Sequence, residues 1–144
     1  MSYNKWMETK LNPYINFKGD TKKAMEFYKS VFGGHLDMTT YKAAGVPCDP
    51  SELDNIMHAM LVSDEGLTLM AADTPTGMEY KPGTNVSMSL SGEDEKLLRS
   101  FWDKLSAGAN LEQPLVKAPW GDTFGMLSDK FGVHWMVNIT AKKA

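Results

Sequence analysis

The sequence contains a single cysteine among its 144 residues. Cys48 cannot form an internal disulfide bond, which is typical of a reducing compartment, and we interpret it as a bystander thiol in a loop. No apolar run approaches the ~18 residues of a membrane span. The opening residues, MSYNKWMETK, lack the apolar core of a signal peptide. We therefore expect a cytoplasmic protein that has no membrane partner.

The sequence also lacks an excess of either charge. It has 15 Lys and Arg against 18 Asp and Glu, a net charge of −3, and its basic residues are scattered. This predicts no nucleic-acid partner. No G-x-G-x-x-G follows a predicted strand, and there is neither a phosphate-binding P-loop nor a G-x-S-x-G elbow. Nucleotide-dependent and serine-hydrolase functions are therefore not supported.

What the sequence does contain is a strand–turn–helix segment over residues 14–34. Residues 14–17 alternate in polarity, as in a strand with two different faces. A glycine–aspartate turn follows, and Asp20 or Thr21 is placed to cap the next helix. Residues 33–34 are glycines, which end a helix readily. The helix between them is predicted by an apolar stripe that consists of Ala24, Phe27, Tyr28, Val31 and Phe32.

A degenerate copy of this segment occupies residues 87–108. Its aromatic pair, Phe101-Trp102, lies 74 positions after the pair in the first helix. The turn glycines, Gly19 and Gly92, are 73 positions apart, so we expect the second turn to carry one extra residue. The helical stripe of the copy consists of Leu98, Phe101, Trp102 and Leu105.

A second sequence similarity is found at the end of each unit. The segment SDEGLTLMA, at 63–71, resembles SDKFGVHWMV, at 128–137, and their glycines lie 66 positions apart. Each unit therefore reads as a strand, a helix and about three further strands. Two copies of so long a unit indicate a duplicated domain rather than a solenoid. The alternative is a pair of unrelated strand–helix units.

The motifs in these two copies resemble the vicinal oxygen chelate superfamily, which includes glyoxalase, bleomycin-resistance and extradiol dioxygenase proteins. The resemblance lies in the strand, the G-D turn and the pattern A-x-x-FY-x-x-x-FGG, and it covers about residues 11–140. The ending DKFGVHWMVN, Pro13-Tyr14 and His58-Ala59 resemble the PhnB-like branch, often labelled 3-demethylubiquinone-9 3-methyltransferase. Nothing in the sequence resembles an S-adenosylmethionine site, so we do not adopt that label.

The resemblance implies an α+β fold of two βαβββ modules that form a cupped mixed sheet with the helices outside. We place tails at 1–10 and 141–144, modules at 11–73 and 85–140, and a linker at 74–84. The loop 43–55 is long enough to cover a site or contact a dimer partner. Beyond residues 14–34, we expect a helix at 94–107 and strands at 36–42, 56–62, 67–72, 85–91, 111–118, 122–128 and 133–140.

Strand parity predicts which side chains face the cup. Residues such as Val86, Met88 and Leu90 should pack on the helices, and their neighbours should face the opposite side. The predicted cup is mostly apolar with a few hydrogen-bonding groups, as in small-molecule pockets. The alternative is that packing or a dimer partner fills these positions. The predicted ligand-binding residues are Tyr14, Asn16, His58, Met60, Met70, Ser87, Ser89, Phe124, Met126, His134, Met136 and Asn138.

In metal-dependent members of the superfamily, His, Gln or Glu at four cup-facing positions holds a divalent ion. Family spacing places these positions at Pro13 or Tyr14, Met70, Ser87 and Met136. None of these is a ligand that such ions favour. We therefore predict no metal and no cofactor. His35 is expected at the surface.

These observations leave three functions open. The first is a homodimeric, metal-free protein that binds a small-molecule ligand, as bleomycin-resistance proteins do. The second is an enzyme with lyase, isomerase or dioxygenase activity, in which His58 serves as general acid or base or joins His134 and Asn138 in an atypical metal site. The third is a dimeric scaffold without a ligand. We favour the first.

Overall fold

The computed structural model describes residues 9–142, so the predicted tails at 1–10 and 141–144 lie largely outside the described residues. The first module comprises β1 (Tyr14–Phe17), α1 (Thr21–Phe32), β2 (His35–Thr40), α2 (Tyr41–Ala44), the 3-10 helix η2 (Pro50–Glu52), β3 (Ile56–Val62) and β4 (Thr68–Asp73). The second comprises β5 (Met88–Gly92), α3 (Glu95–Leu105), β6 (Asn110–Lys117), β7 (Thr123–Ser128) and β8 (His134–Ile139).

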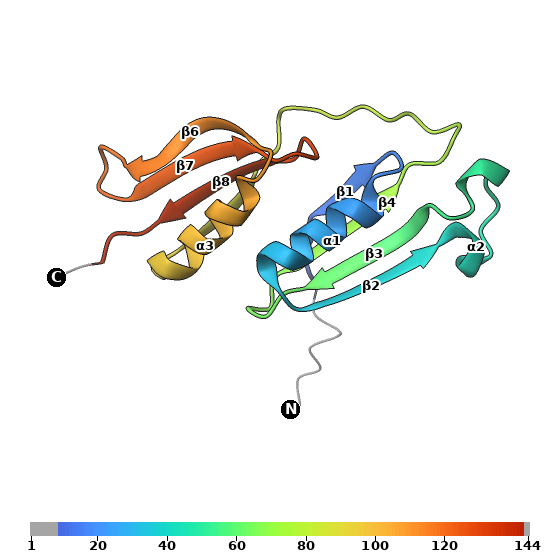
Figure 1. Cartoon of the computed structure of the whole chain (residues 1–144), viewed down its shortest axis with the longest axis horizontal. Helices are drawn as coiled ribbons and strands as arrows, with labels where there is room; N and C mark the ends of the chain where they lie inside the picture. The colour runs from blue at the N-terminus through green and yellow to red at the C-terminus, as the bar shows by residue number, and fades with distance from the viewer. Residues whose placement is uncertain (1–8, 143–144) are drawn as a thin grey trace.

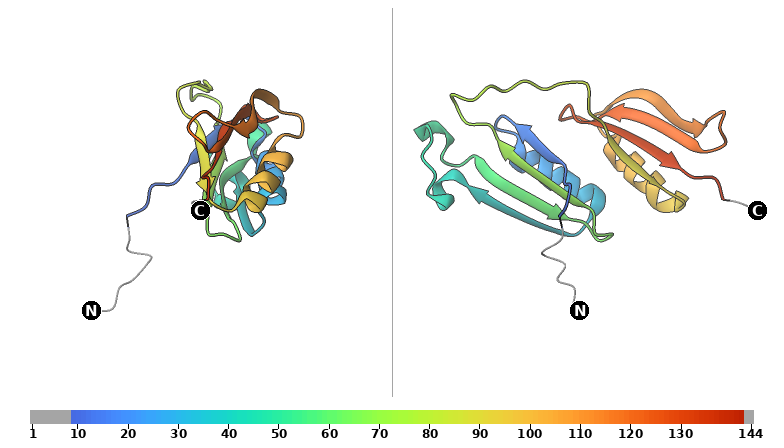
Figure 2. Two further views of the ribbon diagram at one scale, coloured as in Figure 1. Left: turned by 90° about the vertical axis from the view of Figure 1, so that its left-hand side faces the viewer. Right: turned by 180° about the vertical axis from the view of Figure 1, so that it is seen from behind.

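Each module forms its own four-stranded sheet, and the two sheets have the same topology. The strand orders are β1-β4-β3-β2 and β5-β8-β7-β6, with the first pair parallel and the others antiparallel. The predicted α+β fold of two βαβββ modules is therefore confirmed. Helices α1 and α3 cover one face of their own sheets (Figure 1), and the opposite faces are seen from behind (Figure 2).

The hydrophobic core extends through both modules because their helices pack together. The ring centroids of Phe32 on α1 and Phe101 on α3 are 4.9 Å apart, and Phe32 also lies 5.6 Å from Trp135 of β8. All three side chains are buried in one apolar cluster. The modules therefore stabilise each other instead of forming two separate cores. No helix within residues 9–142 has the length and apolar character needed to cross a membrane.

Strand register supports the duplication and corrects one detail of it. Met60 pairs with Met70 and Met126 pairs with Met136, so the offset of 66 holds for these hairpins. Met70 also pairs with Tyr14 and Met136 with Ser89, so the first strands are 75 positions apart. The helices begin 74 positions apart. The second turn is thus one residue shorter, where the sequence predicted it to be longer.

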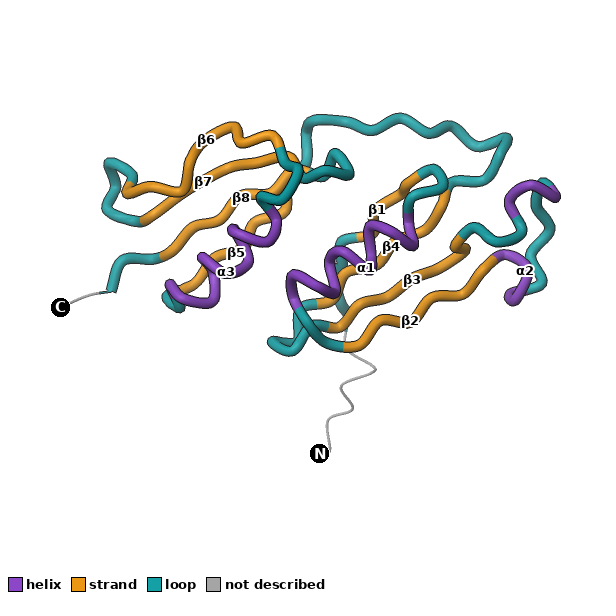
Figure 3. Tube along the Cα trace, in the orientation of Figure 1, coloured by secondary structure: helices purple, strands orange, loops and turns teal. Residues whose placement is uncertain are grey.

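The reason for this difference is that Gly92 is not a turn residue. It is the last residue of β5 and pairs with Ile139, just as Phe17 pairs with Asp73. The start of β5 was also predicted wrongly. Val86 lies before the strand and is 72% exposed, so it does not pack on a helix. Figure 3 shows residues 74–87 as one long loop between β4 and β5.

The loop predicted at 43–55 contains the end of α2 and the 3-10 helix η2. It is anchored to the loop after β4, because the carboxylate of Glu52 accepts a hydrogen bond of 3.0 Å from the backbone N–H of Thr76. Glu52 is 8% exposed. A role for this loop as a lid or dimer contact stays a prediction.

The two main helices are capped in different ways. Asp94 caps α3 locally, since its side chain accepts a hydrogen bond from the backbone N–H of Leu97. Asp20 makes no such bond at the start of α1. There the acceptor is the carboxylate of Asp73, on β4. The backbone N–H of Thr21 donates to it at 3.1 Å, and the Thr21 hydroxyl donates to it at 2.7 Å. The predicted local cap on α1 is therefore wrong.

Tyr28 links the two modules through a buried hydrogen bond. Its hydroxyl, on α1, donates to the carboxylate of Asp129 at 2.6 Å. Burial, and secondarily the charge and hydrogen bond of Asp129, raise the pKa of Tyr28 far above the ordinary tyrosine value. The folded protein therefore holds this proton at pH values where the unfolded chain releases it.

This difference predicts alkaline instability. Above pH ~10 the unfolded chain binds fewer protons at Tyr28 than the folded protein, so the free energy of unfolding should fall by about 1.4 kcal/mol per pH unit from this group. Urea titrations at several pH values between neutrality and the onset of unfolding measure the slope. Tyr28→Phe should be less stable at neutral pH but have a shallower alkaline slope. Equal slopes in the two proteins would contradict this assignment.

Candidate functional site

A large open cavity of about 1370 Å³ lies between the two modules. Its walls include the edge strands β1 and β5, the beginning of β8 and much of the long loop after β4. The first module contributes Tyr14 and Asn16, the loop before β5 contributes Ser87, and the second module contributes Ser89 and His134. This cavity is the candidate ligand site, because both modules and the linker meet there.

The twelve predicted ligand-binding residues are not gathered in this cavity. Only the five just named line it. The others do not line it, because the modules meet through α1 and α3 and their sheets do not close around one hollow. A role for the other seven in binding stays a prediction; they are His58, Met60, Met70, Phe124, Met126, Met136 and Asn138.

The predicted parity of most of these strands is nonetheless correct. On β8, alternate side chains are buried under the helices, namely Trp135, Val137 and Ile139. The other three are half-buried, namely His134, Met136 and Asn138. On β3, Ala59 and Leu61 are buried, but so is Ile56, where the alternation is broken. The physical reason is a register shift between Thr39 and Thr40 on β2, opposite the beginning of β3.

Paired methionines occupy equivalent places on the helix-free face of the two sheets. In the first sheet, Tyr14, Met70 and Met60 form one row across β1, β4 and β3. In the second sheet, Ser89, Met136 and Met126 form the corresponding row. The methionines are half-buried. Their flexible, polarizable side chains give each face an adaptable apolar centre.

These rows contain three of the positions that the family resemblance implies for a metal ion, Tyr14, Met70 and Met136. The register places Ser89, rather than Ser87, beside Met136. The four side chains at these positions are then one phenol, one hydroxyl and two thioethers, which do not fit the divalent ions of the superfamily. Within residues 9–142, no group of three or more His, Cys, Asp or Glu side chains is arranged to hold a metal ion.

His58, the candidate acid or base, forms a pair with Tyr14. Its Nδ1 lies 3.2 Å from the Tyr14 hydroxyl, and the two rings are 5.8 Å apart. Partial burial raises the pKa of Tyr14. Tyr14 lines the cavity but His58 does not. His35 is exposed and lies 3.0 Å from the carboxylate of Asp37, in agreement with its predicted surface position.

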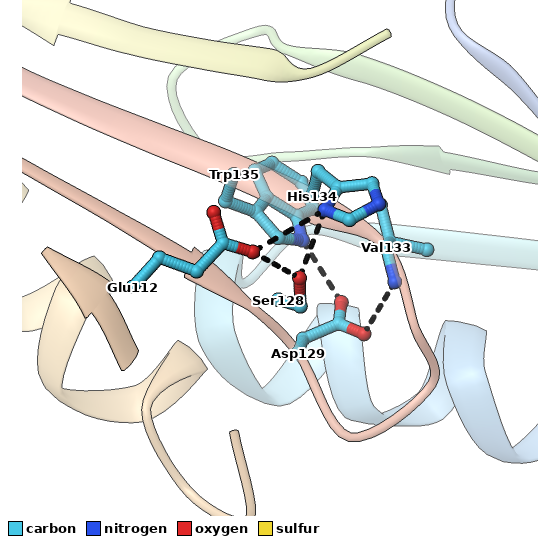
Figure 4. A network of polar contacts seen from close by, with 6 residues as sticks. All are labelled: Glu112, Ser128, Asp129, Val133, His134 and Trp135. Atoms are coloured by element: carbon cyan, nitrogen blue, oxygen red, sulfur yellow. Dashed lines mark hydrogen bonds and ion pairs between the residues drawn. The ribbon is translucent and has the colours of Figure 1, made fainter. Parts of the chain in front are cut away.

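His134 belongs to a polar network on the second sheet that the sequence did not reveal. Its Nδ1 lies 2.8 Å from the Ser128 hydroxyl, and that hydroxyl donates to the carboxylate of Glu112 at 2.7 Å (Figure 4). Ser128 and His134 pair directly across β7 and β8. Glu112 is the extra residue of a β-bulge in β6, between Leu111 and Gln113. The contact between Ser128 and Glu112 joins positions 16 residues apart, so no local pattern in the sequence marks it.

Asn138 is held by a second carboxylate that sequence reasoning missed. Its amide donates to Asp122 at 3.0 Å, and the backbone N–H of Ala141 donates to the other carboxylate oxygen at 2.9 Å. The Ala141 bond and then the Asn138 bond hold the pKa of Asp122 below its ordinary value. Asn138 is therefore already engaged by a carboxylate, and an atypical metal site that joins it to His58 and His134 stays a prediction.

Comparison with known proteins agrees with this architecture. Residues 10–137 match the model of the Glyoxalase/Bleomycin resistance protein/Dioxygenase superfamily, and the chain belongs to this superfamily. The superfamily predicted from the sequence is thus confirmed.

Three relatives show how far the likeness extends. Protein YjdN of Escherichia coli is 26% identical, and the match covers 92% of this chain and 97% of YjdN. The crystal structure of PA1353 from Pseudomonas aeruginosa is 30% identical, with a TM-score of 0.81 over 94% of this chain and all of that one. A PhnB protein from Bacillus cereus shares the fold at 24% identity, with a TM-score of 0.73 over 92% of this chain and all of that one.

Proposed function

We propose that this superfamily member binds a small molecule in the cavity between its modules and does so without the superfamily's metal centre. The observation that carries the proposal is the cavity itself, which is formed jointly by both modules and the linker. Small-molecule sites are concave and combine apolar walls with a few polar groups. Met88, Leu90 and Val133 supply apolar lining here, and Ser89 supplies a hydroxyl.

The side chains at the superfamily's metal positions support binding without an ion. Met70 and Met136 replace ligands on the last strand of each module, and each lies beside another methionine across the neighbouring strand. A thioether does not compensate the charge of a hard divalent cation. The lining of the cavity itself, which includes Met88, Leu90 and Val133, favours an apolar or aromatic ligand that binds by shape and dispersion contacts.

We further propose that the chain acts as a homodimer. The helix-free face of the second sheet carries Trp120, whose ring packs against Phe124 at 5.6 Å and is 62% exposed. Val116 pairs with Phe124 in register and is 56% exposed. A twofold partner of the same chain would cover this apolar surface.

Sedimentation of the wild-type protein should give a dimer. Trp120→Lys should shift the equilibrium towards monomer. A monomeric wild-type protein would contradict the proposal.

The cavity can be tested by filling it. Ser89→Trp places a large ring where an exposed serine lines the cavity. We expect the affinity for 1-anilinonaphthalene-8-sulfonate, an anionic fluorescent probe of apolar surface, to fall about tenfold, which equals about 1.4 kcal/mol. Fluorescence titration measures it. Thr39→Trp is the matched control, because Thr39 is exposed on β2 and does not line the cavity. No probe binding by the wild type, or equal binding by all three proteins, would contradict the proposed site.

A further inference from the structure

The network of Glu112, Ser128 and His134 fixes which nitrogen of the histidine carries the proton. An ionised carboxylate only accepts hydrogen bonds, so the Ser128 hydroxyl must donate its hydrogen to Glu112, over 2.7 Å. The lone pair of the hydroxyl is then left to accept a hydrogen bond from Nδ1 of His134, over 2.8 Å. In neutral imidazole the other nitrogen, Nε2, is consequently an acceptor.

The fold does not require this network. The first module builds the same hairpin between β3 and β4, with Val62 and Thr68 paired in the places of Ser128 and His134. An apolar residue at one of these positions is therefore compatible with the hairpin. The network is confined to the second module, and it is built around a bulge, a feature that is enriched beside functional sites.

His134 also stands at the border of the cavity. It lines the cavity, and 26% of its side chain is exposed. Figure 4 shows the second ring nitrogen on the edge of the ring opposite Glu112 and Ser128. Within residues 9–142, no side chain or backbone group forms a hydrogen bond with Nε2. An acceptor is therefore held in a fixed orientation with nothing in the described part of the chain to satisfy it.

We propose that Nε2 of His134 accepts a hydrogen bond from a hydroxyl group on the bound small molecule, and that Glu112 and Ser128 position it for this role. The inference rests on the proposed cavity function and specifies its ligand class as an apolar body that bears a hydroxyl. Glu112 lies 3.6 Å from Nδ1, so its negative charge also stabilises the positive character that the ring gains as it accepts.

The first test needs no ligand. In protein with ¹⁵N-labelled histidine, at about pH 7.5 where ordinary histidines are mainly neutral, long-range ¹H–¹⁵N spectra identify the protonated nitrogen. We expect His134 to carry its proton on Nδ1. Glu112→Gln can donate as well as accept, so it removes the constraint and should raise the Nε2–H population. His134→Gln identifies the signal. A wild-type His134 with its proton on Nε2 would overturn the inference.

The second test uses two probes that share the naphthalene ring, 1-naphthol, whose oxygen can donate a hydrogen bond, and 1-methoxynaphthalene, whose oxygen cannot. We expect Glu112→Gln and Ser128→Ala to weaken naphthol binding by up to about tenfold and to leave binding of the ether unchanged. His35→Gln, an exposed histidine outside the cavity, is the control. Equal changes for both probes would overturn this inference alone. Failure of the wild type to bind either probe would contradict the proposed function itself.

Discussion

Replacing Asp129 with alanine is expected to lower the free energy of unfolding by about 3–5 kcal/mol. Asp129 is 4% exposed and its carboxylate accepts four hydrogen bonds. One oxygen accepts the Tyr28 hydroxyl at 2.6 Å and the indole N–H of Trp135 at 2.8 Å. The other accepts the backbone N–H groups of Phe131 and Val133, at 2.8 and 3.1 Å.

Loss of this carboxylate leaves four donors without their acceptor, two of them on buried aromatic side chains. Each unsatisfied buried donor costs about 1–3 kcal/mol, although water entering the space offsets part of the sum. Because Tyr28 belongs to the first module and Trp135 to the second, the variant should also loosen the contact between modules. A single domain has only about 5–15 kcal/mol of stability, so much of it would be lost.

The repeat supplies a matched control for this variant. Asp64 occupies the same Ser-Asp motif in the first module, but it is exposed. Asp64→Ala should change stability by no more than about 0.5 kcal/mol. Urea unfolding followed by tryptophan fluorescence compares the two. Similar small losses in both variants would show that the Asp129 network does not hold the modules together as described.

Replacing Asp73 with alanine is expected to cost about 3–4 kcal/mol. Asp73 is 2% exposed and joins three segments of the first module. Its carboxylate accepts the backbone N–H of Gly19 at 2.8 Å, both donors of Thr21, and the backbone N–H of Ile56 at 2.8 Å. Its backbone carbonyl accepts the Tyr41 hydroxyl at 2.7 Å. The side chain thus caps α1 and fixes the beginning of β3.

The second module provides the comparison for this prediction. There Asp94 caps α3 through one exposed hydrogen bond, so Asp94→Ala should cost only about 1 kcal/mol. Hydrogen exchange locates the effect. The amides of Thr21 and Ile56 should lose protection in Asp73→Ala before those of the second module do. Equal costs for the two aspartates would contradict the role assigned to Asp73.

The contrast between these aspartates shows what the sequence predicts well and what it does not. The stripe through Tyr28 and the alternation along β8 are local patterns with a fixed period, so the helices and most strand faces are predictable. The capping role of Asp73 joins positions 52 residues apart, and no local pattern marks it. Asp94 has the same residue type but caps its own helix.

The candidate site was less predictable than the fold for a related reason. Strand parity identified the face on which His134 and Met136 lie, but not that the two sheets meet through α1 and α3. That arrangement leaves Met136 outside the cavity and His134 at its wall. Glu112 was missed because its partner Ser128 lies 16 residues away on the next strand, and no local pattern in the sequence marks that contact.

The metal content of the protein tests the central claim most directly. Protein purified without chelators and then equilibrated with zinc, nickel or manganese should hold far less than one ion per chain after removal of free metal, as measured by elemental analysis. The reason is that such ions do not favour the side chains at the superfamily's metal positions, which are Tyr14, Met70, Ser89 and Met136. One tightly held ion per chain, lost when Met70 or Met136 is changed, would contradict a metal-free binding site.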